Sequence, residues 1–277
     1  MPRDNPVRRV VDRVRSTLRG GQPAEPAAAE IRVHFDTSLE LREYVAARSN
    51  GTCILSFSGG KDSIVAWLAM REQFDKIVPI FMYLVPGLRF VEEGIAYFEE
   101  YFDTHIIRMP HPSLYRLLMN AVFMPPERLR VLEARQWEEF TYDDVFNIVK
   151  LAKGLPLDTW TAIGVRSADS LNRRTAIKRY GSLNIERRTF YPVFDWNKDT
   201  LVETLKDAEV MLPVDYHLFG RSFDGIDYRF LQPLKEKYPD DYATILEWYP
   251  LAELEMKRIE FRKEYYAHNP RTTAAAR

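Results

Sequence analysis

Cysteine is almost absent from this chain of 277 residues, which contains only Cys53. A single cysteine cannot form an intramolecular disulfide, a Cys-x-x-Cys redox pair, a thiolate zinc site or a four-cysteine iron–sulfur site. We therefore expect neither zinc nor an iron–sulfur cluster. Because Cys53 begins an apolar run, where a small thiol packs well in a buried strand, we favour a structural role for it over a catalytic one.

Long apolar runs and an excess of either charge are also missing. The longest apolar stretches are far shorter than the roughly 20 residues that cross a bilayer, and the arginine-rich start has no apolar segment typical of a secretion signal. The net charge is -1 at pH 7, so no overall basic field indicates nucleic-acid binding. We expect a cytoplasmic protein with no membrane partner, long enough to bury a sizeable core.

Histidines are few, and none has a spacing typical of metal ligands. We expect surface or core roles for all five, which are His34, His105, His111, His217 and His268.

The most informative segment that is present is Ser-Gly-Gly-Lys-Asp-Ser at 58–63. It lies between the apolar runs 53–57 and 64–70, so a glycine turn connects a strand to a helix. Adjacent glycines allow positive φ and close approach of an anion, and the first turn of a helix presents N–H groups that have no partner in the helix. The sequence predicts a phosphate-binding loop, and the alternative is a glycine turn without a ligand.

Two other glycine loops do not fit this segment. A Walker A loop requires Gly-x-x-x-x-Gly-Lys-Ser/Thr, but Leu55 stands at the first glycine position and Asp62 follows Lys61. A Rossmann fingerprint requires a third glycine, and none follows Gly60 within the helix.

Residues 37–207 alternate between strand and helix patterns, which is typical of βαβ units and a parallel sheet. We expect helices at 38–48, 63–73, 91–101, 142–153, 169–179 and 198–207, and strands at 52–57, 77–84, 104–109, 159–163 and 189–193. Between 110 and 142 and beyond 207 we expect mostly helices. In an open parallel sheet, ligands bind at the carboxyl ends of the strands, so functional residues should directly follow strands.

A cationic segment follows the expected strand at 159–163. Arg166 lies in the loop, and Arg173, Arg174 and Lys178 lie on the next helix, where Arg174 and Lys178 share one face. A guanidinium group suits bidentate phosphate binding and stabilises the charge of a departing pyrophosphate. The alternative interpretation is a solvated basic helix.

The pattern Ser-Gly-Gly-x-Asp-Ser resembles the pyrophosphate loop (PP-loop) of the ATP pyrophosphatase superfamily, whose members split ATP between its α and β phosphates. With residues 85–92, 164–174 and 191–196, it resembles the phosphoadenosine phosphosulfate (PAPS) reductase family over roughly residues 50–225. The resemblance implies an α/β fold that is adenine nucleotide alpha hydrolase-like: an open parallel sheet of about five strands with helices on both faces. It also implies ATP or a related adenine nucleotide over the strand ends, with Mg²⁺.

From the motifs and this resemblance together we predict which residues form the site. The predicted nucleotide-binding residues are Ser56, Ser58, Gly59, Gly60, Lys61, Asp62, Ser63, Gly87, Gly164, Arg166 and Arg173. The predicted catalytic residues are Lys61, Asp62, Arg166 and Arg174. Asp62 either orients the metal or caps the start of the helix, and both interpretations stay open.

Departures from the family limit the function. Reductases carry a nucleophilic cysteine in a C-terminal Glu-Cys-Gly-x-His arm, and many hold a cluster on cysteine pairs; this chain has neither. The family's Asp-Thr-Gly after the second strand is replaced by the residues at 85–87, which puts the family's nucleotide specificity in question, and residues 220–225 replace a cysteine-bearing loop. We do not expect sulfonucleotide reduction.

We expect three parts in the chain: a basic amphipathic helix and linker at 1–30, a nucleotide-binding domain at 31–225, and a helical extension at 226–277 packed on it. The first helix either docks on the body or binds a protein or nucleic acid. The helix at 251–266 closes the domain or pairs with another subunit. The aromatic residues after 195 belong to the core or stack on bases.

Three functional hypotheses follow. The first is an enzyme that adenylates an unknown acceptor and releases pyrophosphate. The second is a nucleotide-binding regulatory or partner protein, for example in transcription co-activation, that works with another subunit on DNA. The third is adenylation within a pathway of sulfur transfer to nucleic acid.

Overall fold

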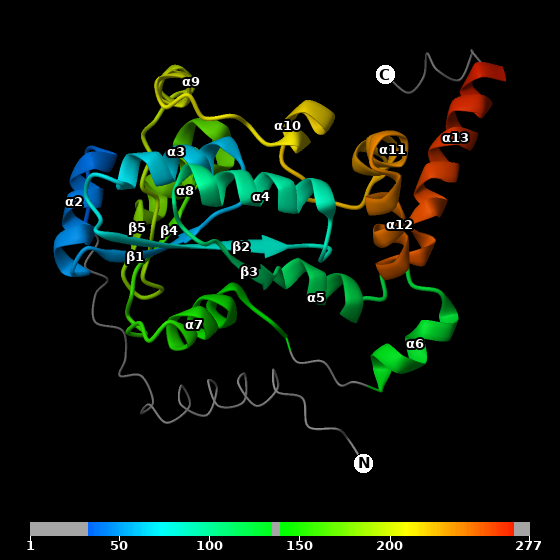
Figure 1. Cartoon of the computed structure of the whole chain (residues 1–277), viewed down its shortest axis with the longest axis horizontal. Helices are drawn as coiled ribbons and strands as arrows, with labels where there is room; N and C mark the ends of the chain where they lie inside the picture. The colour runs from blue at the N-terminus through cyan, green and yellow to red at the C-terminus, as the bar shows by residue number, and fades with distance from the viewer. Residues whose placement is uncertain (1–32, 135–138, 269–277) are drawn as a thin grey trace. The chain divides into compact units, whose positions relative to one another are not determined.

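The computed structural model describes residues 33–134 and 139–268 (Figure 1). These residues form two compact units, each assembled from three stretches of chain. Unit 1 takes its described residues from 33–82, 103–109 and 140–211, and unit 2 takes them from 83–102, from 110–134 with residue 139, and from 212–268. The predicted basic helix and linker at 1–30 lie outside the described residues, and the predicted division after residue 225 stays a prediction.

Unit 1 is built on a sheet to which the described residues contribute six strands. In chain order these are β1 (Thr52–Ser56), β2 (Lys76–Tyr83), β3 (Ile107–Pro110), β4 (Thr161–Ile163), β5 (Leu183–Asn184) and β6 (Thr189–Phe190). Their order across the sheet is β3-β2-β1-β4-β6-β5. β1 pairs in parallel with β2 on one side and with β4 on the other, and β4 pairs in parallel with β6. The prediction of an α/β fold with an open parallel sheet is confirmed.

One strand departs from the parallel pattern. β5 runs antiparallel to β6 and was not predicted, because two residues carry no periodic signal. The strand predicted at 189–193 is correspondingly short, and the chain after it turns instead of continuing the ladder.

Helices lie on both sides of these strands, with α3 above and α7 below them in Figure 1. The described residues of unit 1 form the helices α2 (Ser38–Arg48), α3 (Lys61–Met70), α7 (Tyr142–Ala152), α8 (Leu171–Tyr180) and α9 (Lys198–Asp207), with a 3₁₀ turn η1 (Ser167–Asp169). β1 and α3 supply much of the core, since Ile54, Leu55, Ile64 and Val65 are fully buried. Burial on both faces of β1 is what a central parallel strand requires.

Cys53 lies in this core. It is fully buried as a free thiol, and burial raises the pKa of the thiol. A thiol that is both inaccessible and protonated is a poor nucleophile, which agrees with the structural role expected for it.

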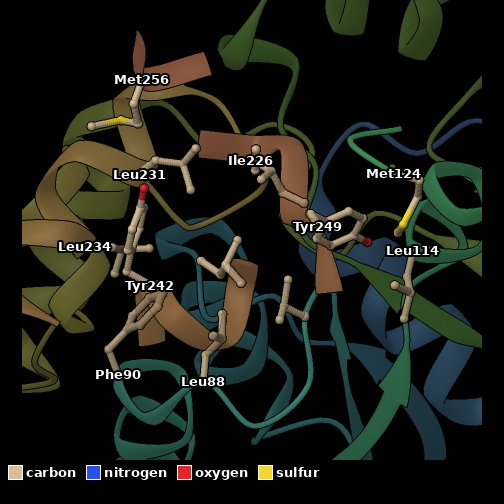
Figure 2. Close-up of a cluster of buried hydrophobic side chains, with 13 residues drawn as sticks. Leu88, Phe90, Leu114, Met124, Ile226, Leu231, Leu234, Tyr242, Tyr249 and Met256 are labelled. Carbon is tan, nitrogen blue, oxygen red and sulfur yellow. The ribbon is translucent and has the colours of Figure 1, made fainter. Parts of the chain in front are cut away.

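Unit 2 is helical. Its helices are α4 (Arg89–Tyr101), α5 (Pro112–Met119), α6 (Pro126–Glu133), α10 (Val214–Phe219), α11 (Tyr228–Lys237), α12 (Pro239–Trp248) and α13 (Glu253–His268), with a 3₁₀ turn η2 (Pro250–Ala252). Figure 2 shows its core, in which Leu231 and Leu234 of α11 gather with Phe90 and Tyr249. Phe230 and Tyr249 are completely buried, so these two aromatic residues serve the core and not base stacking.

A buried carboxylate caps the start of α4. Asp241 of α12 is 3% exposed and accepts the backbone N–H groups of Arg89 at 2.7 Å and of Phe90 at 3.0 Å. The N-cap residue of α4, Leu88, makes no side-chain cap of its own, so α12 supplies the cap from 152 residues away in sequence. The N–H groups that a helix start could offer to a phosphate are therefore already used at α4.

No helix of the described residues combines the length and the apolar character needed to cross a membrane.

Candidate functional site

The loop after β1 is shaped by a small set of hydrogen bonds. The Ser63 hydroxyl donates to the Gly60 carbonyl at 2.8 Å and accepts the Ser58 backbone N–H at 3.2 Å. The Ser58 hydroxyl lies 3.2 Å from the Ser63 hydroxyl and accepts the Gly60 N–H at 3.3 Å. Gly59 has a φ of +69°, the left-handed conformation that favours glycine. The two serines and the two glycines therefore hold a tight turn that leads into α3.

Two backbone donors in this turn have no acceptor within the described part of the chain. Among the residues that the structure describes, the N–H groups of Gly59 and Asp62 bond to nothing, and the N-cap residue Gly60 contributes no side-chain cap. The N–H groups of the first helical turn cannot bond within the helix, and the helix dipole places positive charge there. Unpaired donors with positive charge form the arrangement that binds phosphate in other helix-start sites.

The order of the strands brings a second loop to the same place. β4 lies next to β1 and runs parallel to it, so the loops that follow both strands leave the same edge of the sheet. β2 lies on the other side of β1, so the strand order reverses between β1 and β4. Open α/β sheets bind ligands in the crevice at such a reversal.

Gly164, directly after β4, allows a close approach to the first turn of α3. A Cβ atom at this position would lie 2.8 Å from the backbone of Asp62 and Ser63. The structure thus gives Gly164 a packing role against the first turn of α3. Its predicted contact with a nucleotide stays a prediction.

Four charged side chains form a chain of ion pairs across the two loops. The Arg166 Nε donates to Asp62 Oδ1 at 2.6 Å, and Arg166 Nη2 donates to Asp169 Oδ1 at 2.6 Å. Asp169 Oδ2 accepts Arg173 Nη1 at 2.5 Å. The Arg166 side chain is 5% exposed, and such a buried charge needs both carboxylates to offset its lost hydration. The network therefore fixes the positions of Arg166 and Asp62 relative to each other.

This network rules out one of the two interpretations of Asp62, the capping of α3. The capping interpretation is wrong, because the start of α3 at Lys61, with Gly60 as its N-cap, has no side-chain cap and the Asp62 carboxylate bonds Arg166 instead. Metal binding by Asp62 stays a prediction. Among the described residues no group of three or more His, Cys, Asp or Glu side chains is arranged to hold a metal ion.

The other predicted residues divide by location. Arg173 joins the network through Asp169, whereas Arg174, the next residue on α8, is exposed and outside it. Ser56 is the last residue of β1, and Lys61 is the first residue of α3. Gly87 belongs to unit 2, where it has a φ of +74° in the turn before α4.

Sequence reasoning missed Asp169. It lies three residues after Arg166 and four before Arg173, and it bonds both guanidinium groups. Spacings of three and four residues are those at which helical side chains meet, so the sequence did contain the signal. The carbonyl of Phe194, which accepts the Ser167 N–H at 2.8 Å, gave no signal because any residue has a carbonyl.

Comparison with known proteins yields only remote similarity. No family model matches the sequence, and no curated protein matches it. One similar solved structure is the NH3-dependent NAD synthetase from Campylobacter jejuni in complex with nitrate, with 14% identity and a TM-score of 0.35 over 82% of this chain and 94% of that chain. Another is a predicted subunit of tRNA methyltransferase from Methanocaldococcus jannaschii, with 16% identity and a TM-score of 0.29 over 69% and 92%.

Proposed function

We propose that unit 1 binds ATP at the loop after β1 and uses it to adenylate an acceptor. The observation that carries the proposal is the pair of N–H groups, of Gly59 and Asp62, at the positive start of α3, for which the described residues provide no acceptor. The resemblance of residues 58–63 to a pyrophosphate loop supports a triphosphate as the anion. Lys61, at the first position of α3, adds a positive charge there.

In the proposed reaction, an acceptor oxygen attacks the α phosphorus of ATP. The bond from the acceptor oxygen to the α phosphorus forms, the bond from that phosphorus to the α,β-bridging oxygen breaks, and pyrophosphate leaves with the bonding electron pair. The acceptor proton passes to solvent. The loop amides and Lys61 hold the β and γ phosphates, and Arg166, with Arg173 or Arg174, stabilises charge at the α phosphate.

The oxygen atoms at the loop fit Mg²⁺, which prefers oxygen ligands and is ordinarily held by one or two carboxylates together with phosphates of the substrate. Asp62 and the Ser58 hydroxyl are the residues that would hold it. When bound, the ion neutralises phosphate charge.

One observation favours a second candidate function, a nucleotide-binding partner protein without turnover. Arg166 is already bonded to both Asp62 and Asp169, so its charge is offset before any nucleotide arrives. Turnover requires phosphate oxygens to compete with these carboxylates, whereas binding at the loop amides does not.

Substitution of Gly60 tests ATP binding with the helix start preserved. Gly60 has φ −75° and ψ 152°, a conformation open to any residue, and both Asp and Asn are preferred N-caps. We expect Gly60→Asp to weaken ATP binding at least tenfold more than Gly60→Asn, because only Asp adds negative charge beside the phosphates. Isothermal titration with ATP and Mg²⁺ measures both.

The matched pair separates charge from steric effects, since Asp and Asn have nearly the same shape. Equal ATP affinities of Gly60→Asp and Gly60→Asn, or no binding by the wild-type chain, would reject the proposal. Products from α-labelled ATP then separate the two candidates: pyrophosphate with a labelled adenylate indicates turnover, and binding without either product indicates a partner protein. Arg166→Ala is a poor test, because it leaves two carboxylates facing each other without their shared partner.

A further inference from the structure

The last described helix, α13 (Glu253–His268, red in Figure 1), uses one side to pack within unit 2. Met256 is 1% exposed, and Lys263 Nζ, two turns further on the same side, donates to the Tyr228 hydroxyl at 2.7 Å. On this inner side α13 lies against η2 and α11. The inner side of α13 therefore serves the fold of unit 2.

A second apolar stripe lies on the outer side of α13. Leu254 and Phe261 are 54% and 69% exposed, and Tyr265 is 56% exposed. Steps of seven and four residues return to nearly the same side of an α-helix, so the three side chains form one stripe. At about 100° per residue, this stripe lies roughly opposite Met256 and Lys263. A surface helix ordinarily has a single apolar stripe, which faces the core, so the outer stripe of α13 is an interaction surface.

The spacing of the outer stripe is that of a coiled-coil seam. Leu254 and Phe261 occupy one of the two seam positions of a seven-residue repeat, and Arg258 and Tyr265 occupy the other. The charge of Arg258 is already offset, because its Nε and Nη2 donate to the carboxylate of Glu255 at 2.8 and 2.7 Å. An arginine paired in this way costs less to bury against a partner than an unpaired one. The outer stripe therefore suits a second helix.

The charges beside the stripe select the direction of that helix. Lys257 and Glu264 lie on one flank of the seam, and Arg262 lies on the other. When two identical helices pair antiparallel, the same flanks meet, so Lys257 of each copy lies beside Glu264 of the other. When they pair in parallel, opposite flanks meet, and Lys257 lies beside Arg262 of the other copy. Like charges in contact oppose association, so α13 is complementary to itself only in the antiparallel direction.

We propose that α13 pairs antiparallel with α13 of a second copy of this chain. In this arrangement Leu254 packs against Tyr265 of the second copy, and Arg258 lies against the ring of Phe261 of the second copy. A guanidinium group over an aromatic face is a favourable contact. The same stripe on both copies meets across a twofold axis, as a closed homodimer requires. The proposal concerns unit 2 and is tested without ATP, so it and the ATP proposal fail separately.

Sedimentation velocity of the full chain between about 1 and 200 μM measures the pairing over the range of micromolar dissociation constants. Two helices of 16 residues bury less than the standard interface of about 1,600 Å², so we expect a weak, concentration-dependent dimer. Phe261→Ala should weaken dimerisation at least about tenfold, because it removes an aromatic side chain from the centre of the seam. The matched control is Leu171→Ala, which removes a side chain that is 76% exposed on α8 and should leave the dimer unchanged.

Exchange of the two flanking charges tests the direction of the pair. Lys257→Glu places two carboxylates side by side across each end of the pair and should weaken the dimer about tenfold at about 50 mM salt, as should Glu264→Lys. The double variant, Lys257→Glu with Glu264→Lys, brings opposite charges together again and should restore wild-type dimerisation. Lys206→Glu on α9 makes the same change of charge in unit 1 and should have no effect.

Several results would overturn the proposal. A wild-type chain that stays monomeric up to the highest concentration would show that the outer stripe serves a different partner. A dimer that Phe261→Ala does not weaken would place the contact on another surface. A dimer that Lys257→Glu strengthens would indicate a parallel pair, because a carboxylate would then lie beside Arg262. Failure of the double variant to restore dimerisation would likewise reject the antiparallel direction.

Discussion

Gly164 sets how closely two backbone segments approach at the phosphate loop. A Cβ atom there would lie 2.8 Å from the carbonyl group of Asp62 and from the N atom of Ser63, which are rigid backbone atoms. Gly164→Ala must therefore push the first turn of α3 away from β4, at a cost of about 1–3 kcal/mol typical of overpacking. We expect a lower melting temperature and, because the Asp62 amide moves, weaker ATP binding. Thermal unfolding and ATP titration measure the two effects.

A glycine in a roomier place provides the comparison for this substitution. A Cβ atom at Gly94, inside α4, would make an ordinary contact of 3.4 Å with Pro213. Alanine is favoured over glycine in a helix by about 1 kcal/mol, so Gly94→Ala should keep or raise the stability. If Gly164→Ala kept or raised the stability as Gly94→Ala does, the first turn of α3 would not pack closely against Gly164 as described.

The sequence predicted the cationic loop and the glycine loop separately but could not predict the ion pairs between them. Arg166 and Asp62 are 104 positions apart, and only the adjacency of β1 and β4 brings them together. The ion pairs of Asp169 with Arg166 and Arg173 could have been predicted from sequence spacing alone. Local pairs are thus readable from the chain, whereas pairs across the sheet require its strand order.

At the scale of single elements, His111 begins α5 in an unusual way. Its Nδ1 accepts the Ser113 backbone N–H at 2.9 Å, so this nitrogen must be unprotonated for the cap to exist. Burial and, as the smaller cause, the positive charge of Arg116 lower the pKa of His111. The protonated form is therefore disfavoured in the folded chain relative to the unfolded chain.

The lowered pKa of His111 predicts that the free energy of unfolding of unit 2 falls at acidic pH. Because the folded pKa of His111 is lowered, the unfolded chain binds more protons in this range, and stability falls as the pH drops below the unfolded value of about 6.5. We expect His111→Asn, which keeps a capping oxygen but cannot titrate, to lose less unfolding free energy than the wild-type chain between pH 7.5 and about 5.5. Urea unfolding at both pH values measures the difference, and parallel losses in the two chains would contradict it.

The predicted bounds were accurate for two helices whose start is marked by a local side-chain cap. α2 and α9 begin and end as predicted, and the side chains of Thr37 and Asn197 cap them from the residue before. α3 starts two residues earlier than predicted because its cap is Gly60, which carries no side-chain signal. α4 takes its cap from Asp241, and no local pattern can announce a cap from a distant helix.

At the scale of the whole molecule, each unit has a core of its own. Ile54 of β1 is fully buried among the strands of unit 1, and Leu234 of α11 is fully buried in the cluster of unit 2 that Figure 2 shows. The chain enters and leaves each unit more than once, so sequence order alone does not reveal this division. The strand and helix patterns were visible along the chain, but which helices share a core depends on packing.

Separate cores predict that a cavity in one unit loosens mainly that unit. Ile54→Ala and Leu234→Ala each remove a fully buried aliphatic side chain and should cost about 2–5 kcal/mol. By hydrogen exchange with mass spectrometry, we expect Leu234→Ala to reduce the protection of α11 and α12 with little change in β1 and β4, and Ile54→Ala to do the reverse. Each variant is the control for the other. Equal losses across both units in both variants would mean that the chain opens as one cooperative body, because local openings cannot spread a single cavity's cost evenly.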